Sequence, residues 1–253
     1  MGEGGAATLF QMRVQPYLDS VQQGTVAEVW RRLVEHYLPA KAVVVDLTYR
    51  SGRMWTGLRG VKVIAFDLDQ EVGGIDAIAD CRYPPLRPLI ADAVVFDPPW
   101  AEDAGRTGYA GPKYNCAFTC PEQVLDLVRP EAWARITRPD GFLFVRCADY
   151  HHEGRFVDLS TDLSRVLTEP PSGAAWSPWD KVIHVIGGRP PRYPMVSPPK
   201  TRKVHSYFLV FRRKGRGQAG GLDRDGGGFA AARGAELPEG LWTPGPGAAL
   251  GDP

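Results

Sequence analysis

The sequence predicts an α/β fold with a mainly parallel, seven-stranded sheet and an antiparallel closing hairpin. Short β-branched runs typical of fully buried strands alternate with segments of helical periodicity through most of the chain. Two further strands near the C-terminal end follow each other without a helix, so they should pair antiparallel at or near one edge. The 253 residues are 43% hydrophobic and 23% charged, which is ordinary for a soluble globular protein with one large core.

The elements follow from local patterns. Thr25 can cap a helix whose apolar positions recur at helical spacing until Pro39 ends it. Pro130 can divide the second helix. The expected helices are residues 25–38, 121–136 and 156–167, and the expected strands are residues 42–47, 61–66, 75–79, 93–96, 142–145, 182–186 and 206–212.

The expected organisation is a disordered leader at 1–9, one domain at 10–214 and a disordered Gly/Ala/Pro-rich tail at 215–253. No apolar run of about 18 residues exists and the start lacks signal-peptide features, so we expect a cytoplasmic protein away from membranes. Cys116 and Cys120 lack a second pair or a nearby histidine, so free thiols and no metal site are expected.

The near-neutral net charge of +1 conceals a basic segment. Residues 189–216 contain nine Lys or Arg and no Asp or Glu. A Pro-rich arm at 189–205 lies within it, and a stiff, extended basic arm suits contacts with nucleic-acid phosphates. Its expected nucleic-acid contacts are Arg192, Lys200, Arg202, Lys203 and His205.

Aspartates stand at the ends of the first four predicted strands: Asp46, Asp67, Asp80 and Asp97. Each could be a loop-capping residue. Because ligands of open parallel sheets bind at the carboxyl ends of the strands, the four together indicate a binding crevice.

The loop after the first strand predicts the kind of ligand. It contains one glycine, Gly52, and lacks the GxGxxG pattern of dinucleotide sites. Asp67, about 20 residues on, can accept hydrogen bonds from ribose hydroxyls. A nucleoside without pyrophosphate indicates S-adenosylmethionine.

The fourth strand is followed by Asp97-Pro98-Pro99-Trp100. An exocyclic amine is a poor nucleophile because its lone pair is delocalised into the ring. A carboxylate and a backbone carbonyl that accept its two N–H bonds localise that lone pair. The prolines hold the turn stiff beside Asp97, and Trp100 can stack on a base turned out of its helix.

These residues resemble those of class I S-adenosylmethionine-dependent amino-methyltransferases of the N6-adenine/N4-cytosine type. The stretch DLTYRSGRMW resembles the DxTYGxGxxW cofactor loop of small phage and actinobacterial N6-adenine DNA methyltransferases, and GFLFVRCAD and KVHSYFLVFRR resemble their fifth and closing strands. The similarity covers residues 42–213 in patches.

The resemblance implies a Rossmann-like class I methyltransferase fold, with DNA as the favoured partner and Asp97, Pro98, Pro99 and Trp100 forming the catalytic pocket. The cofactor residues that it implies are Asp46, Leu47, Thr48, Tyr49, Gly52, Asp67 and Asp80. Asp67 would contact the ribose, Asp80 the adenine amine, and Asp46, Thr48 and Gly52 the methionine end.

Arg50 departs from the pattern, since these loops usually carry glycine there. If the backbone needs a positive φ, arginine costs roughly 1 kcal/mol. Its side chain would then either crowd the cofactor or point outward, toward a phosphate or a carboxylate.

The remaining motifs are less specific. Residues 105–115 predict a mobile flap over the target base, on which Tyr109 and Tyr114 could stack. The pair His151 and His152 is expected to be polar surface, and Trp176 and Trp179 are expected to pack.

Several functions stay open. The target could be N4 of cytosine, adenine in RNA or a protein glutamine instead of adenine N6 in DNA. The chain could also be a catalytically weak nucleic-acid-binding module descended from a methyltransferase.

Overall fold

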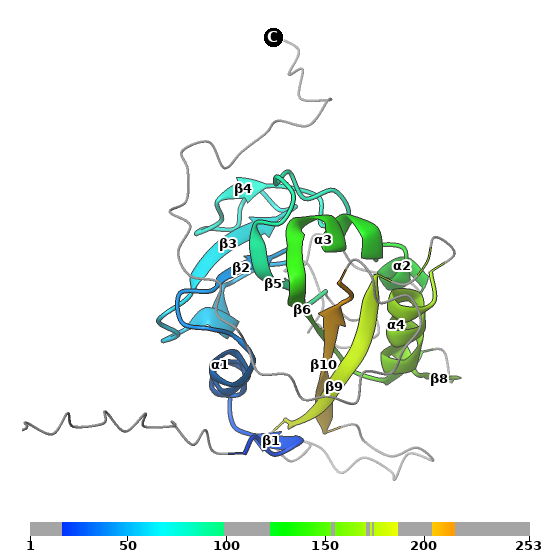
Figure 1. The fold of residues 1–253 in the computed structure, drawn as a ribbon. Helices are drawn as coiled ribbons and strands as arrows, with labels where there is room; N and C mark the ends of the chain where they lie inside the picture. The colour runs from blue at the N-terminus through cyan, green and yellow to red at the C-terminus, as the bar shows by residue number, and fades with distance from the viewer. Residues whose placement is uncertain are drawn as a thin grey trace, which may run out of the picture.

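The computed structural model describes residues 17–98, 122–152, 155–170, 173, 175–186 and 204–215. Their centre is an eight-stranded sheet in the order β1-β9-β10-β6-β5-β2-β3-β4 (Figure 1). All strands run parallel except β10, which is antiparallel to both β6 and β9. This is a Rossmann-like order, in which the last two strands, β9 and β10, pair antiparallel as the sequence predicted and β10 lies inside the sheet.

The bounds of the elements follow in chain order. The strands are β1 (Val21–Gln23), β2 (Val43–Asp46), β3 (Lys62–Asp67), β4 (Ala77–Ile78), β5 (Ala91–Phe96), β6 (Thr137–Cys147), β7 (Tyr150–His152), β8 (Arg155–Val157), β9 (Trp176–Val185) and β10 (His205–Arg213). The helices are α1 (Val26–Tyr37), the 3₁₀ turn η1 (Arg53–Trp55), α2 (Glu122–Leu125), α3 (Pro130–Ile136) and α4 (Leu159–Thr168). Strands β7 and β8 form a separate antiparallel hairpin.

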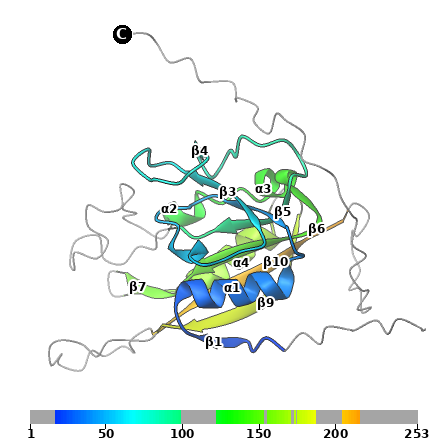
Figure 2. The same ribbon diagram turned by 90° about the vertical axis from the view of Figure 1, so that its left-hand side faces the viewer.

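Helices cover both faces of the sheet. Helix α1 lies across one face, with β1 along the neighbouring edge (Figure 2), and α2, α3 and α4 lie on the other face (Figure 1). The core on the α1 side is built around Trp30, Phe144 and Phe208, and the opposite core around Trp133 and Leu163. Within the described residues, no helix is both long and apolar enough to cross a bilayer.

Helix α1 shows how the sequence sets a boundary. The Thr25 hydroxyl accepts from the Glu28 N–H at 3.3 Å, and the Glu28 carboxylate accepts from the Thr25 N–H at 2.7 Å, which makes a capping box. The helix ends at Tyr37, before Pro39. Its inward face consists of Val29, Trp30, Leu33, Val34 and Tyr37.

Several predicted elements differ in detail. The sheet has an eighth strand, β1, which pairs with β9. The predicted helix at 121–136 is divided into two, as Pro130 allowed: α2 ends at Leu125, and Pro130 begins α3. The predicted helix at 156–167 begins at Leu159, since 155–157 belongs to β8. Besides β3 and β4, the fully described segment between β2 and β5 contains the η1 turn and no α-helix.

Candidate active site

The candidate site lies where the strand order reverses. Strands β2 and β5 are parallel neighbours in the centre of the sheet, although β3 and β4 lie between them in the sequence. Such a switch point opens a crevice at the carboxyl ends of the strands. Asp46 ends β2, Asp67 ends β3 and Asp97 follows β5, so three of the predicted carboxylates meet at this edge.

The loop after β2 is bonded to β5 on one side. The Leu47 N–H donates to the Val95 carbonyl at 3.0 Å, and the Leu47 side chain is buried in the core. The hydroxyl of Thr48 accepts from the Asp97 N–H at 2.8 Å. The predicted cofactor loop therefore fixes the backbone of the predicted catalytic aspartate.

The same loop is bonded to β3 on the other side. The Tyr49 N–H donates to the Phe66 carbonyl at 2.9 Å, and the Arg50 N–H donates to the Asp67 carboxylate at 2.7 Å. Arg50 has a φ of 52°, so this position does use the conformation that favours glycine. Nη1 of Arg50 lies 3.2 Å from the Asp69 carboxylate, so the structure shows the expected orientation toward a carboxylate.

Gly52 also has a positive φ, of 61°, and lies against Tyr49. A Cβ at position 52 would be 2.5 Å from the Tyr49 hydroxyl oxygen. The Gly52 carbonyl accepts from the Trp55 N–H at 2.9 Å, which begins the η1 turn. Any side chain at position 52 would therefore strain the backbone and displace the tyrosine ring.

Asp46 is the most buried carboxylate of the site, with 1% of its surface exposed. It accepts from the Thr48 N–H at 2.9 Å and from the indole N–H of Trp55 at 2.6 Å. Burial raises the pKa of Asp46 to about 7, because these hydrogen bonds offset only part of the desolvation and the charges of Asp97 and Asp67 add to it. A cation in the crevice would relieve this cost.

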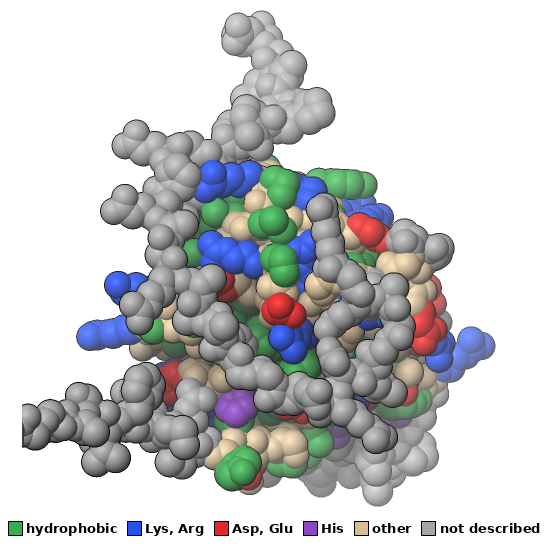
Figure 3. Space-filling view, in the orientation of Figure 1, with side chains coloured by type: hydrophobic (Ala, Val, Ile, Leu, Met, Phe, Trp, Pro, Cys, Tyr) green, Lys and Arg blue, Asp and Glu red, His purple; other side chains and the backbone are tan. Residues whose placement is uncertain are grey.

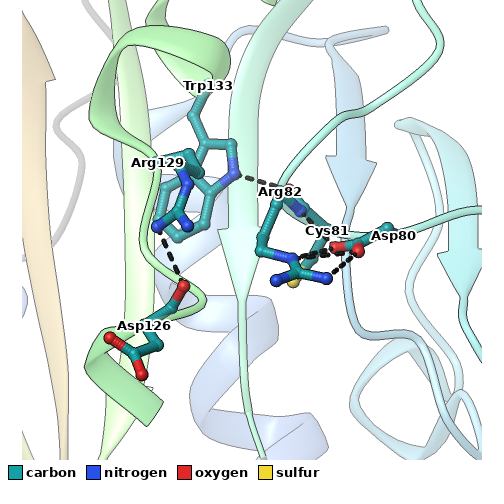
Figure 4. A network of polar contacts seen from close by, with 6 residues as sticks. All are labelled: Asp80, Cys81, Arg82, Asp126, Arg129 and Trp133. Carbon is teal, nitrogen blue, oxygen red and sulfur yellow. Dashed lines mark hydrogen bonds and ion pairs between the residues drawn. The ribbon is translucent and has the colours of Figure 1, made fainter. Parts of the chain in front are cut away.

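Asp80 lies beyond β4 and is held by an arginine of its own loop (Figure 4). The Arg82 guanidinium donates to both carboxylate oxygens of Asp80, with its shortest contact 2.6 Å from Nη2. This pairing lowers the pKa of Asp80, and the charge of Arg129 adds to the effect. The indole of Trp133 on α3 donates to the Cys81 carbonyl at 2.7 Å, which ties the Asp80 loop to the helix layer.

Asp97 is paired with Arg146, a residue that the sequence reasoning missed. Nη1 of Arg146 lies 3.2 and 3.4 Å from the two carboxylate oxygens. Burial raises the pKa of Asp97, and the charge and hydrogen bond of Arg146 oppose that rise. The register Phe96↔Val145 brings the next residue of each strand together, so knowledge of the β5–β6 pairing would have identified Arg146. Pro98, which follows Asp97, is buried.

The other predicted site residues are only partly described. His205 starts β10, where its ring nitrogen lies 2.8 Å from the Tyr207 hydroxyl. Among the described Lys and Arg side chains, those visible in Figure 3 are spread over the face instead of gathered in one patch. The predicted residues outside the described part of the chain are Pro99, Trp100, Tyr109, Tyr114, Arg192, Lys200, Arg202 and Lys203.

The two tryptophans that were expected to pack differ in their exposure. Trp176 is fully buried and donates to the Pro130 carbonyl at 3.0 Å, whereas Trp179 is 51% exposed. His151 lies against Phe156 in the β7–β8 hairpin. The described residues contain no group of three or more His, Cys, Asp or Glu that could hold a metal ion.

No family model and no curated protein matches the chain. A SAM-dependent methyltransferase from Methanosarcina mazei matches 72% of this chain and 97% of its own, with a TM-score of 0.46 and 10% identity. The N-methyltransferase NodS from Bradyrhizobium japonicum matches 74% and 96%, with a TM-score of 0.45 and 12% identity.

A candidate DNA modification methylase from Thermus thermophilus, complexed with S-adenosyl-L-methionine, matches 51% of this chain and 50% of its own. Its TM-score is 0.33 and its identity 19%. Because all three TM-scores are low, we infer the function from the site itself.

Proposed function

We propose that this protein transfers a methyl group from S-adenosylmethionine to an exocyclic amino group of a base, with adenine N6 in DNA as the favoured target. The observation that carries the proposal is the fixed carboxylate of Asp97 at the switch point of the sheet. Its N–H is held by Thr48 and its side chain by Arg146, and a buried proline follows. Such an arrangement suits recognition of an amino group, because a fixed carboxylate can accept one of its N–H bonds.

The described residues fit S-adenosylmethionine in charge and hydrogen-bonding capacity. Asp46 and Asp67 raise the local negative charge, and both Asp67 and Asp97 raise the pKa of Asp46. The cofactor carries a sulfonium and an ammonium group, so it would offset this repulsion. Arg50 does not oppose binding, because its guanidinium is directed to Asp69.

When bound, the cofactor would supply an electrophilic methyl group. The residues of this chain would prepare the acceptor. The Asp97 carboxylate would accept one N–H of the base amine and the Pro98 carbonyl the other, which localises the nitrogen lone pair. Trp100 would stack on the base and Asp67 would accept hydrogen bonds from the ribose, with Asp80 near the adenine amine.

Two predicted segments support a nucleic-acid substrate. The basic arm at 189–205 offers positive charge for phosphates, and the glycine-rich segment at 105–115 follows the Asp97 tetrapeptide in the sequence. Tyr109 and Tyr114 within that segment could stack on bases. We expect the affinity of the protein for nucleic acid to fall steeply between about 50 and 200 mM salt. An affinity that does not change with salt would contradict the role of the arm.

The test is mass spectrometry of nucleosides after DNA and RNA are incubated with the protein and S-adenosylmethionine carrying a labelled methyl group. Labelled N6-methyladenine in DNA is expected, and Asp97→Ala should reduce it by at least about 100-fold. Label in N4-methylcytosine or in RNA adenine would correct the target. No label in either nucleic acid would overturn the proposal.

Calorimetry with the cofactor then separates an enzyme from a binding module. A methyltransferase should bind S-adenosylmethionine, with heat that saturates below about 1 mM. A nucleic-acid-binding module that has lost the cofactor would give no heat, while its binding to DNA remained.

A further inference from the structure

The proposed chemistry assigns no role in the reaction to Arg146. It lies on β6 directly beside Asp97, and their side chains are 17% and 23% exposed. One guanidinium nitrogen is within 3.4 Å of both carboxylate oxygens, and each oxygen has a second lone pair that this contact does not use. Arg146 lies within the central strand β6, and Asp97 directly follows the neighbouring central strand β5.

The sheet itself sets the position of Arg146. Phe208 pairs with it across β10 and β6, and the guanidinium lies 5.9 Å from the centre of the Phe208 ring. Phe208 is 1% exposed and packs under α1. A guanidinium fixed over a buried ring loses little further entropy when it pairs with a carboxylate.

The neighbouring charges come from several elements. The charge of Asp97 helps to raise the pKa of Asp46 on β2. Burial raises the pKa of Cys147 on β6, the charge of Asp97 adds to that rise, and the charge of Arg146 opposes it. On β9, the charge of Arg146 helps to lower the pKa of His184. Arg146 is thus the cation that opposes the rise in the pKa of Asp97 caused by burial. Asp46 lies close enough for the two carboxylates to repel each other.

We propose that Arg146 is a positioning residue that keeps Asp97 ionised and directed toward the target amine. This inference rests on the proposed function. An ionised carboxylate is an acceptor only, which is the state needed to receive an N–H of the base. A carboxylate paired with a guanidinium is also a weaker base, so Asp97 orients the neutral amine before attack. The proton that the methylated nitrogen must release would then pass to solvent, as the sulfonium becomes a neutral thioether.

The kinetic test compares Arg146→Gln, Arg146→Lys and the wild type across pH. Arg146→Gln should lose at least about tenfold more kcat/KM at about pH 6 than at about pH 8.5, because Asp97 then protonates more easily. Arg146→Lys should restore most of the loss at the lower pH. An equal loss by Arg146→Gln at both pH values would indicate a structural role and overturn the proposal.

The chain offers a matched control. Arg138 pairs with Asp92 at 2.5 Å between the same two strands, at their opposite ends. Arg138→Gln removes a comparable ion pair away from the site, so it should leave the shape of the pH profile unchanged. The same change of shape in Arg138→Gln would refute a specific effect of Arg146.

A stability cycle tests the ion pair independently of activity. Asp97→Asn, Arg146→Gln and the double variant are unfolded in urea at neutral and acidic pH. The unfolding constants at about pH 8 should show a coupling of at least about fivefold that disappears at about pH 4. If the protein methylates nothing, the proposed function fails and the cycle still decides whether Arg146 keeps Asp97 charged. Absence of coupling would overturn the inference.

Discussion

Replacing Asp46 with asparagine should change how the stability of the protein depends on pH. The pKa of Asp46 is about 7 in the folded state against an ordinary value of 3.8, so the folded state binds this proton more tightly than the unfolded chain does. Stability therefore falls as pH rises from the lower to the higher value. The total loss is on the order of 4 kcal/mol, and about 3 kcal/mol of it falls between about pH 5 and 8.

Asparagine cannot ionise, so this loss should disappear in the variant. Its side chain can still accept from one of the two donors, the Thr48 N–H or the Trp55 indole, but it presents an N–H to the other. One mismatched donor costs about 1–3 kcal/mol at every pH. We thus expect Asp46→Asn to be less stable than the wild type in acid and at least as stable above about pH 8.

Urea unfolding followed by far-UV circular dichroism, at intervals from about pH 5 to about pH 9, measures both curves. Glu71→Gln removes one exposed carboxylate from a nearby loop and controls for the change in net charge. If the difference between wild type and Asp46→Asn were the same at every pH, Asp46 would not carry a buried charge and the reasoning would be refuted.

Three further predictions concern the same region and the edge of the sheet. The affinity for S-adenosylmethionine should rise about tenfold between about pH 6 and 8 in the wild type as Asp46 ionises, and calorimetry should find no such rise in Asp46→Asn. Arg50→Val should be less stable than Arg50→Gly by about 1 kcal/mol, because both lose the ion pair but only valine resists a positive φ. His184 has a pKa below its ordinary 6.5 because it is buried, so its contribution to stability is present above that value and lost as pH falls below it.

Each of these has a clear contrary result. A rise in affinity that persists in Asp46→Asn would assign it to another group. Equal urea midpoints for Arg50→Val and Arg50→Gly would mean that the loop relaxes away from the positive φ. For His184, the wild type should lose stability relative to His184→Gln in acid, and parallel pH curves would contradict a neutral buried ring.

The strands and their terminal acids could be predicted because both depend on local sequence. A run such as residues 43–46 is β-branched and ends in an acid, which is enough to predict a buried strand with a carboxylate at its end. The loop departure at Arg50 was also readable, since the need for a positive φ follows from the glycine usually found there. The structure confirms that φ and selects the carboxylate of Asp69 as its partner.

The residues that were missed depend on contacts between distant segments. Strand β1 has the polar sequence Val-Gln-Gln and forms because β9 offers an edge, which local propensity does not reveal. Arg146 resembles an ordinary solvent-facing charge within a strand until the register places it beside Asp97. Sequence reasoning therefore found the acids of the site but not the cation that balances one of them.

The position of β10 affects how the protein can fold. It is the last described strand in the sequence, yet it lies inside the sheet between β6 and β9. Until residue 213 has left the ribosome, the segment from β2 to β6 and the pair of β1 and β9 have no strand to join them, and β6 keeps an open edge. Long-range pairing of this kind is slow and exposes strand edges to other chains. Synthesis of this protein therefore includes a period in which the proposed catalytic strand ends exist but β1 and β9 are not yet joined to their sheet.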